Sequence, residues 1–286
     1  MSRFNKYTLR ETLNETNTTI IFVLLTLILT VAQVCITNKV FIHQNTNSQN
    51  SQQMIPEGNM NSASTSVTKS GETEVDGTDE TLTANYTTSE NDKSVILVEN
   101  DGNLTLDGAE VSKTGGDSSN TENSEFYGVN AGILVTENST STIKNATIDT
   151  NAKGSNAVFS TGTDSKIYIS DSTITTTGSS SSRGLDATYG GYIEADNVKI
   201  TTQGESCATL ATDRGEGTVI AKNSKLETNG SGSPVIYSTG DISITNTEGT
   251  ANGSQMVVIE GKNTATVTNS TLTASAQGLK LIIYQH

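Results

Sequence analysis

A short block of sequence recurs through the last two thirds of the chain, and this repeat constrains the fold more than any other feature. Residues 94–111 (SVILVENDGNLTLDGAEV) align without a gap with residues 131–148 (AGILVTENSTSTIKNATI), and shorter copies follow. A fixed period of this kind is typical of stacked repeat architectures. One column of the alignment, with steps of 37, 26, 26, 26, 23 and 23 residues, holds Gly108, Asn145, Asp171, Asn197, Asn223, Asn246 and Asn269.

Each copy alternates apolar and polar residues, which is the period of a β-strand. A unit of 23–26 residues has room for three short strands and three turns. Leucine-rich repeats have a similar length but need a helical half, and no helical period is present. The sequence therefore predicts an all-β fold. We expect a parallel β-solenoid of about seven coils over residues 81–286, with coils stacked about 4.8 Å apart.

The asparagine column predicts a fixed corner in every coil. Stacked Asn side chains can hydrogen-bond to one another along the axis, and Asn tolerates the left-handed backbone that such a corner needs. Asp can take the same place, and Gly108 keeps the backbone conformation without the side chain. We therefore expect a structural ladder formed by Asn145, Asp171, Asn197, Asn223, Asn246 and Asn269.

A second set of strands is predicted between the ladder positions. In each of these strands one apolar residue is expected to face inward, and under strict alternation the residue before it faces outward. These preceding residues, from Leu97 to Val258, would form an apolar strip on the surface. Because exposed apolar strips of this length are uncommon, either a bend turns them inward, which we prefer, or a partner covers them. Alignment by apolar residues gives an inward column of Val98, Val135, Phe159, Ala187, Ala211, Tyr237 and Ile259.

The N-terminal region has the pattern of a membrane-targeting segment. Residues 20–36 (IIFVLLTLILTVAQVCI) carry no charge over 17 positions, which is the lower limit for a membrane span. Three basic residues lie in residues 1–19 and only Lys39 follows closely, so the positive-inside rule keeps residues 1–19 in the cytosol. We expect a single-pass anchor in the cell membrane with the β-helix domain extracellular. A cleaved signal peptide and a lipid anchor at Cys35 are the alternatives.

Residues 37–80 separate this segment from the repeats. They contain few apolar residues and show no period, so they cannot bury enough surface to offset the entropy of ordering. The sequence predicts a disordered polar spacer that holds the β-helix domain off the membrane.

Composition excludes several classes of function. The chain has 17 Lys and Arg against 31 Asp and Glu, a net charge of −14, which argues against nucleic-acid binding. Thr, Ser and Asn make up 107 of 286 residues, as in a β-repeat with a hydroxyl-rich surface or a polar disordered chain. With two Cys and two His, the chain has no disulfide framework, no four-cysteine zinc site and no His-based triad in the repeats.

One constellation of side chains has the composition of a chemical site. Asp186 and Tyr189 belong to one predicted coil, and Asp213, Arg214 and Glu216 to the next. Because neighbouring coils are about 5 Å apart, these groups are expected within about 5–10 Å of one another. They would suit glycan contact, acid–base chemistry or a Ca²⁺ ion, which is the one cofactor considered. The alternative is that all five are solvated turn residues.

Three segments carry a family resemblance. Residues 123–135 (NSEFYGVNAGILV), 183–191 (RGLDATYGG) and 211–218 (ATDRGEGT) resemble the adhesin-like surface proteins of gut Firmicutes and related anaerobes. The resemblance covers about residues 85–286. It implies a right-handed parallel β-helix of the pectate-lyase-like type, displayed at a cell surface. It implies architecture and location better than chemistry, because one fold hosts many functions.

Three functions are consistent with these patterns. The first is a membrane-anchored adhesin or carbohydrate-contacting module without catalysis, whose partner is a glycan or a host or cell-surface ligand. The second is a polysaccharide lyase or hydrolase, or a degenerate relative, with its site near residues 184–216. The third is an inert structural stalk. The chain ends on an apparent strand, and an open solenoid end exposes backbone and core, so we also expect a truncated chain, a capped oligomeric end or a sticky terminus.

Overall fold

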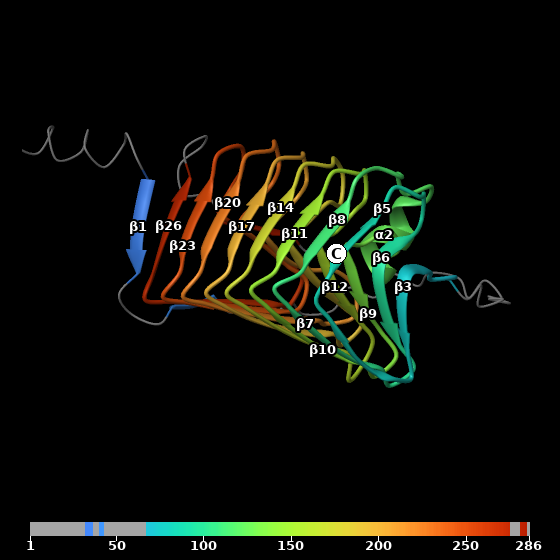
Figure 1. The fold of residues 1–286 in the computed structure, drawn as a ribbon. Helices are drawn as coiled ribbons and strands as arrows, with labels where there is room; N and C mark the ends of the chain where they lie inside the picture. Colours follow the sequence, from blue (N-terminus) through green and yellow to red (C-terminus); the bar gives the residue numbers. More distant parts are fainter. Residues whose placement is uncertain (1–31, 37–39, 43–66, 275–280, 285–286) are drawn as a thin grey trace, which may run out of the picture.

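Successive strands pass in turn through three sheets, so that each coil contributes one strand to every sheet (Figure 1). The computed structural model describes residues 32–36, 40–42, 67–274 and 281–284. Over these residues each sheet has nine strands, and the stacked strands pair in parallel except for β1 and β2, which pair antiparallel. The predicted parallel β-solenoid is confirmed. It has eight complete coils, β3 to β26, where about seven were expected.

Every coil gives one strand to each sheet, and these strands follow one another in chain order, whereas β1 and β2 lie beside β26 and β25 at the C-terminal end. Sheet A contains β1 (Ala32–Ile36), β5 (Asn85–Thr88), β8 (Glu110–Lys113), β11 (Thr147–Thr150), β14 (Thr173–Thr176), β17 (Lys199–Thr202), β20 (Lys225–Thr228), β23 (Glu248–Ala251) and β26 (Ser270–Ala274). Sheet B contains β2 (Val40–Ile42), β4 (Asp79–Leu82), β7 (Asn103–Asp107), β10 (Thr140–Lys144), β13 (Lys166–Ser170), β16 (Tyr192–Asp196), β19 (Thr218–Lys222), β22 (Asp241–Thr245) and β25 (Thr264–Thr268). Sheet C contains β3 (Gly71–Asp76), β6 (Ser94–Glu99), β9 (Ile133–Val135), β12 (Val158–Thr161), β15 (Leu185–Thr188), β18 (Leu210–Thr212), β21 (Ile236–Ser238), β24 (Val257–Glu260) and β27 (Leu281–Tyr284).

The first coil begins at Gly71, ten residues before the start that the sequence suggested. Its strands β3 and β4 are rich in acids, and their composition matches that of the expected spacer. Val75 is nevertheless fully buried in the core, and β3 pairs with β6 along its length. A single inward apolar residue per strand is thus enough here, because the next coil supplies the rest of the core.

The core is a narrow column of aliphatic side chains that runs along the axis. It also contains hydroxyls, which the alternation of apolar residues does not reveal. Four buried threonines end successive strands of sheet A and donate to carbonyl oxygens in the turn that follows, at 2.6–2.9 Å. Buried polar groups that are satisfied in this way add little cost. The donors are Thr150, Thr176, Thr202 and Thr228.

The repeated corner between sheets B and A has the left-handed backbone expected of it. The φ angles at the six ladder positions lie between 47° and 53°, and Gly108 has a φ of 68°. All six ladder side chains are exposed. The Asn269 amide donates to Asn246 at 2.6 Å and the Asn246 amide donates to Asn223 at 3.3 Å, whereas Asn223 donates to Asp196 at 2.7 Å. The ladder is therefore a mixture of amide and carboxylate contacts at the surface.

The second inward column differs from the expected one at three positions. The register pairs Phe159 with Asp186, Asp186 with Ala211, and Ala211 with Tyr237, so these residues share one outward column. Hydroxyl residues take the corresponding inward places, namely Ser160, Thr212 and Ser238. The apolar alignment failed because it assumed that inward residues are apolar.

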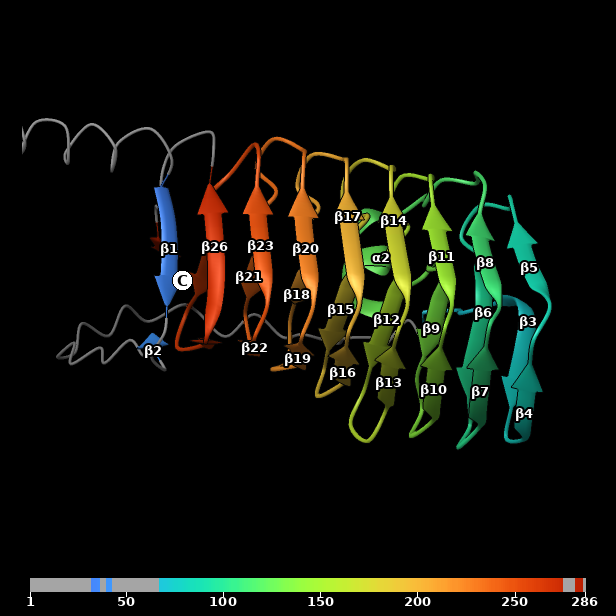
Figure 2. The same ribbon diagram turned by 60° about the vertical axis from the view of Figure 1, so that its left-hand side comes forward.

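The expected outward strip divides into two groups. Val158, Leu210 and Ile236 face the core, because the expected register is wrong at these strands. Leu97 and Leu134 face outward, and an insertion in the chain covers this part of sheet C. Leu97, Leu134 and Phe159 form a second buried cluster with Ala131, separate from the core. Helix α2 (Thr121–Tyr127) is part of the connection between β8 and β9, and it is visible beside the sheets in Figures 1 and 2. The outward part of the strip is therefore covered by the chain itself rather than turned inward by a bend.

Two caps define helix α2. The Asn120 side chain accepts from the backbone N–H groups of Glu122 and Asn123, at 2.9 and 3.3 Å. Gly128 ends the helix with a φ of 68°, a conformation that glycine adopts without strain. A Cβ at Gly128 would lie 2.5 Å from Phe159 Cδ1, so the helix end also approaches the sheet too closely for a side chain.

Candidate functional site

A groove of about 680 Å³ lies between helix α2 and the outward face of sheet C. It follows the covered apolar strip along the axis, at the point where the outward column changes from aliphatic residues to charged and aromatic ones. Its lining residues are Glu125, Phe126, Arg183, Asp213, Arg214, Gly215, Tyr237, Thr239 and Glu260.

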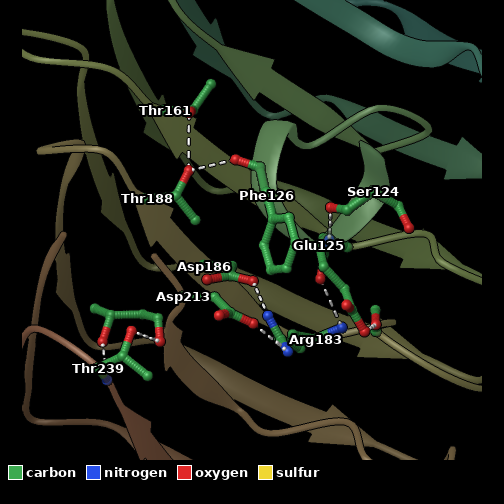
Figure 3. A network of polar contacts seen from close by, with 12 residues as sticks. Ser124, Glu125, Phe126, Thr161, Arg183, Asp186, Thr188, Asp213 and Thr239 are labelled. Atoms are coloured by element: carbon green, nitrogen blue, oxygen red, sulfur yellow. Dashed lines mark hydrogen bonds and ion pairs between the residues drawn. The ribbon is translucent and has the colours of Figure 1, made fainter. Parts of the chain in front are cut away.

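Arg183 joins two carboxylates at the groove (Figure 3). Its Nη1 donates to Asp186 Oδ2 at 2.7 Å, and its Nη2 donates to Asp213 Oδ2 at 2.9 Å. The Arg183 and Asp186 side chains are 9% and 0% exposed, respectively. Removing one member of a buried ion pair leaves the other charge without compensation, at a cost of about 3–5 kcal/mol. The Arg183 triad, formed by Arg183, Asp186 and Asp213, therefore fixes the position of the Asp213 carboxylate.

Asp186 has a strongly perturbed environment. Burial raises the pKa of its carboxyl to about 7, against the opposing effect of the Arg183 guanidinium. Its Oδ1 atom is buried and has no hydrogen-bond partner among the described residues. A carboxyl with no exposed surface cannot touch a ligand in the groove. Asp186 therefore acts by holding Arg183.

Two guanidinium groups lie over aromatic rings. The Arg214 guanidinium carbon lies 4.0 Å from the centroid of the Phe126 ring, and that of Arg183 lies 5.5 Å from the Tyr237 ring. Cation–π contacts of this kind hold a guanidinium in a defined orientation. Burial raises the pKa of the Tyr237 hydroxyl, which therefore stays protonated and can donate.

Polar contacts attach helix α2 to the sheet beneath it. Asn156 Nδ2 donates to the carbonyl oxygen of Ser124 at 3.0 Å, and Asn156 Oδ1 accepts from the backbone N–H of Arg183 at 3.0 Å. Thr188 Oγ1 donates to the carbonyl oxygen of Phe126 at 2.8 Å (Figure 3). One wall of the groove is thus coupled directly to the strand region that carries the Arg183 triad.

The structure brings together only part of the predicted constellation. Asp186 and Asp213 meet through Arg183, and Arg214 lies in the groove lining. Tyr189 lies outside that lining and stacks on Tyr127, with ring centroids 5.4 Å apart. Glu216 is exposed, has a φ of 60° and is not part of the lining either.

Several lining residues were missed from the sequence. The apolar alignment assigns Tyr237 to the core. Glu125 and Thr239 had no signal of their own. A register taken from the stacked strands places Asp186, Ala211, Tyr237 and Val258 in one outward column, which would have identified Tyr237 as a neighbour of the site.

The site offers aromatic rings, hydrogen-bond donors and carboxylates in a fixed arrangement, which suits a polar ligand with apolar faces. Within residues 32–36, 40–42, 67–274 and 281–284, no group of three or more His, Cys, Asp or Glu side chains is arranged to hold a metal ion. Burial raises the pKa of the Cys207 thiol to about 11, so this cysteine remains a protonated core residue at neutral pH.

A second groove of about 520 Å³ runs along the corner ladder. It contains hydroxyl, amide and ammonium groups repeated from coil to coil. Among the described residues no aromatic ring lines it, and it lies along the corner between sheets B and A, whereas Asp186 of the Arg183 triad lies in sheet C. Its lining residues include Asp171, Asn197, Lys199, Asn223, Lys225, Asn246 and Glu248.

The described part of the chain contains no helix that is long and apolar enough to cross a membrane. The expected anchor, residues 20–36, lies outside the described residues except for its last five positions, which form β1.

Comparison with known families identifies the repeat. The family model described as the right handed beta helix region matches residues 131–284. Searches of curated proteins and of solved structures give no match. The matched segment covers more than half of the chain and contains β9 to β27 together with the Arg183 triad. The protein therefore belongs to the right-handed β-helix family.

Proposed function

We propose that this protein is a membrane-attached, surface-displayed β-helix that contacts a glycan without cleaving it. The groove between helix α2 and sheet C is the proposed contact site. An adhesin function of this kind needs a rigid, elongated scaffold and a preformed polar site, and the solenoid supplies both.

One observation carries the proposal. The groove combines two aromatic rings, Phe126 and Tyr237, with two guanidinium groups whose orientations are fixed by those rings. Sugars present apolar C–H faces and many hydroxyls, so they are recognised by aromatic rings together with hydrogen-bonding groups. The acidic carboxylates Asp213, Glu125 and Glu260 complete the lining and can accept hydrogen bonds from hydroxyls.

Polysaccharide cleavage is the second candidate, and Asp186 is the observation that favours it. Its pKa of about 7 suits a general acid, and Asp213 lies beside it through Arg183. Against this candidate, Asp186 is fully buried and both carboxylates are engaged by Arg183. A general acid must reach the proton acceptor on the substrate, so the geometry favours binding over catalysis.

The membrane attachment in this proposal rests on the uncharged segment 20–36 and on the basic residues before it. With this orientation the acidic solenoid lies outside the cell. The third alternative, an inert stalk, predicts no ligand at either groove.

A chromatography experiment separates these functions. The full-length protein is incubated in detergent micelles with neutral and acidic polysaccharides, with and without Ca²⁺, and polymer size and protein co-elution are followed together. We expect co-elution of the protein with at least one polymer of unchanged length. Shortened polymer would establish an enzyme instead. If no polymer is shortened and none co-elutes with the protein, the result would favour the inert stalk.

A further inference from the structure

The two ends of the solenoid differ in charge. The outer coil at the N-terminal end is acidic, with Glu72, Glu74 and Asp76 in β3 and Asp79 and Glu80 in β4. Charged side chains on an edge strand discourage pairing with other strands. At the opposite end, β25 (TATVT) and β26 (STLTA) contain no charged residue. The C-terminal end is therefore the one that accepts a further strand.

The N-terminal part of the chain occupies this end. β1 pairs antiparallel with β26, beside which it lies in Figures 1 and 2. β2 pairs antiparallel with β25, and β27 pairs parallel with β24. All three sheets are thus closed at the C-terminal end by one added strand each. The register sets Cys35 opposite Thr271 and Gln33 opposite Thr273.

The connection back to the first coil is long enough for the cap to come from the same chain. Eight coils at about 4.8 Å each span roughly 40 Å along the axis. The 28 residues between β2 and β3, numbers 43–70, can reach about 90 Å when extended, at about 3.3 Å per residue. The chain can therefore return from one end of the solenoid to the other without strain.

Capping and membrane spanning compete for the same residues. The apolar segment 20–36 measures about 26 Å as a helix, at 1.5 Å per residue, which is already short for a hydrocarbon core of about 30 Å. If residues 32–36 form β1, the remaining 12 residues would measure only about 18 Å, which is too short to cross. One molecule cannot place these five residues in both positions.

We propose that β1 and β2 form a detachable cap on the C-terminal end of the solenoid, released when residues 20–36 insert into a membrane. This inference rests on the proposed membrane attachment. In the free protein, β1 and β2 satisfy the edge backbone groups of β26 and β25. Insertion withdraws β1 and uncovers the uncharged edge of β26.

A disulfide test follows from the register. The full-length Thr271→Cys variant is made by cell-free synthesis without lipid and oxidised under mild conditions. Directly opposite residues of an antiparallel pair have Cα atoms about 4.5–5.5 Å apart, within disulfide range. We expect a cross-link between Cys35 and the introduced thiol within one chain, identified by peptide mass mapping and by migration as a monomer. Synthesis in the presence of phosphatidylcholine–phosphatidylglycerol vesicles should abolish the cross-link in the fraction that floats with the vesicles.

Matched variants give the controls. Thr273→Cys places the thiol two residues along β26, about 8 Å from Cys35, which is beyond disulfide range, and should not cross-link. Cys35→Ser combined with Thr271→Cys should not cross-link either, which excludes Cys207. Absence of the cross-link in the lipid-free Thr271→Cys protein would overturn the proposal, and so would a disulfide-linked dimer or a cross-link retained in vesicle-bound protein. Vesicle flotation of the Cys35→Ser protein reports on membrane attachment separately. If it fails to float, the attachment is wrong whatever the cross-link shows.

Discussion

Among single residues, the corner positions hold the coil geometry mainly through their backbone. Asn197 has a φ of 53° and an exposed side chain that donates to Asp171 at 2.7 Å. A residue with a Cβ costs about 1–2 kcal/mol in this conformation unless, like Asn, its side chain compensates locally. The backbone, rather than a buried polar contact, therefore makes Asn the preferred residue here.

Asn197 gives a test of this explanation. We expect Asn197→Ala to lower the free energy of unfolding by about 1 kcal/mol, while Asn197→Gly lowers it by less, because glycine adopts positive φ freely. Urea denaturation of the full-length protein in micelles measures both. Equal losses for the two variants would place the effect in the side-chain contact rather than in the backbone.

Asp186 makes stability depend on pH. Its folded pKa of about 7 lies above its ordinary value of 3.8, so the folded state binds more protons than the unfolded state between these values. The contribution of Asp186 is thus present below about pH 4 and is lost as the pH rises to about 7. We expect Asp186→Asn to flatten the decline of unfolding free energy with rising pH in this window. Parallel curves for the two proteins would show that Asp186 titrates normally.

Residue-level prediction from the sequence succeeded where one conformation demands one residue type. The corner column could be identified because few residues tolerate positive φ, and the repeat supplied six examples. The groove could be predicted only in part. Tyr237 was assigned to the core, since Ser160, Thr212 and Ser238 take inward positions that the apolar pattern attributes to their neighbours.

Among the secondary-structure elements, helix α2 decides which part of sheet C is covered and which part is groove. Its seven residues are too few for a stable helix in isolation, so it depends on its caps and on the sheet beneath it. So short an element leaves no helical period in the sequence. The outward position of Leu97 and Leu134 could be predicted from the sequence, but the insertion that covers them could not.

A comparison of two glycine positions separates the cost of backbone strain from the cost of overpacking at the end of α2. Gly128 and Gly108 both have a φ of 68°, but a Cβ at Gly128 would meet Phe159 at 2.5 Å, whereas nothing lies within 4 Å of one at Gly108. We expect Gly108→Ala to cost about 1 kcal/mol and Gly128→Ala about 2–4 kcal/mol, because overpacking adds to strain. Thermal unfolding of both variants measures the difference. Equal costs would mean that α2 moves away from the sheet without penalty.

Taken as one body, the solenoid is a one-dimensional stack in which each coil contacts only its neighbours. The order of strands within every sheet follows the order of coils in the chain. This regularity is why the fold class could be predicted from the sequence, and why the first coil was not: its acidic strands lack the repeated apolar positions. β1 and β2, which lie at the C-terminal end, come from outside the repeat and have no sequence signal of pairing.

Deleting one coil tests the modular architecture. Removal of residues 224–246 joins Asn223 to Thr247 and keeps the corner register, so the protein should still fold. The slope of its unfolding free energy against denaturant concentration should fall by roughly one eighth, because this slope is proportional to the surface exposed on unfolding. Removal of residues 224–235 alone shifts every later coil by half a turn and should abolish cooperative unfolding. A half-coil deletion that unfolds like the full-coil deletion would contradict the stacked architecture.

Glycan contact at the groove between α2 and sheet C can be measured by affinity electrophoresis. The full-length protein is run in gels that contain the polysaccharide retained in the chromatography panel. The test variant is Tyr237→Ala, and the control is Tyr168→Ala, which removes an exposed tyrosine from sheet B, outside the groove. We predict about tenfold weaker retention for Tyr237→Ala, equivalent to about 1.4 kcal/mol, and retention close to that of the unmodified protein for Tyr168→Ala. Unchanged retention of Tyr237→Ala, or an equal loss in both variants, would contradict the assignment of the groove.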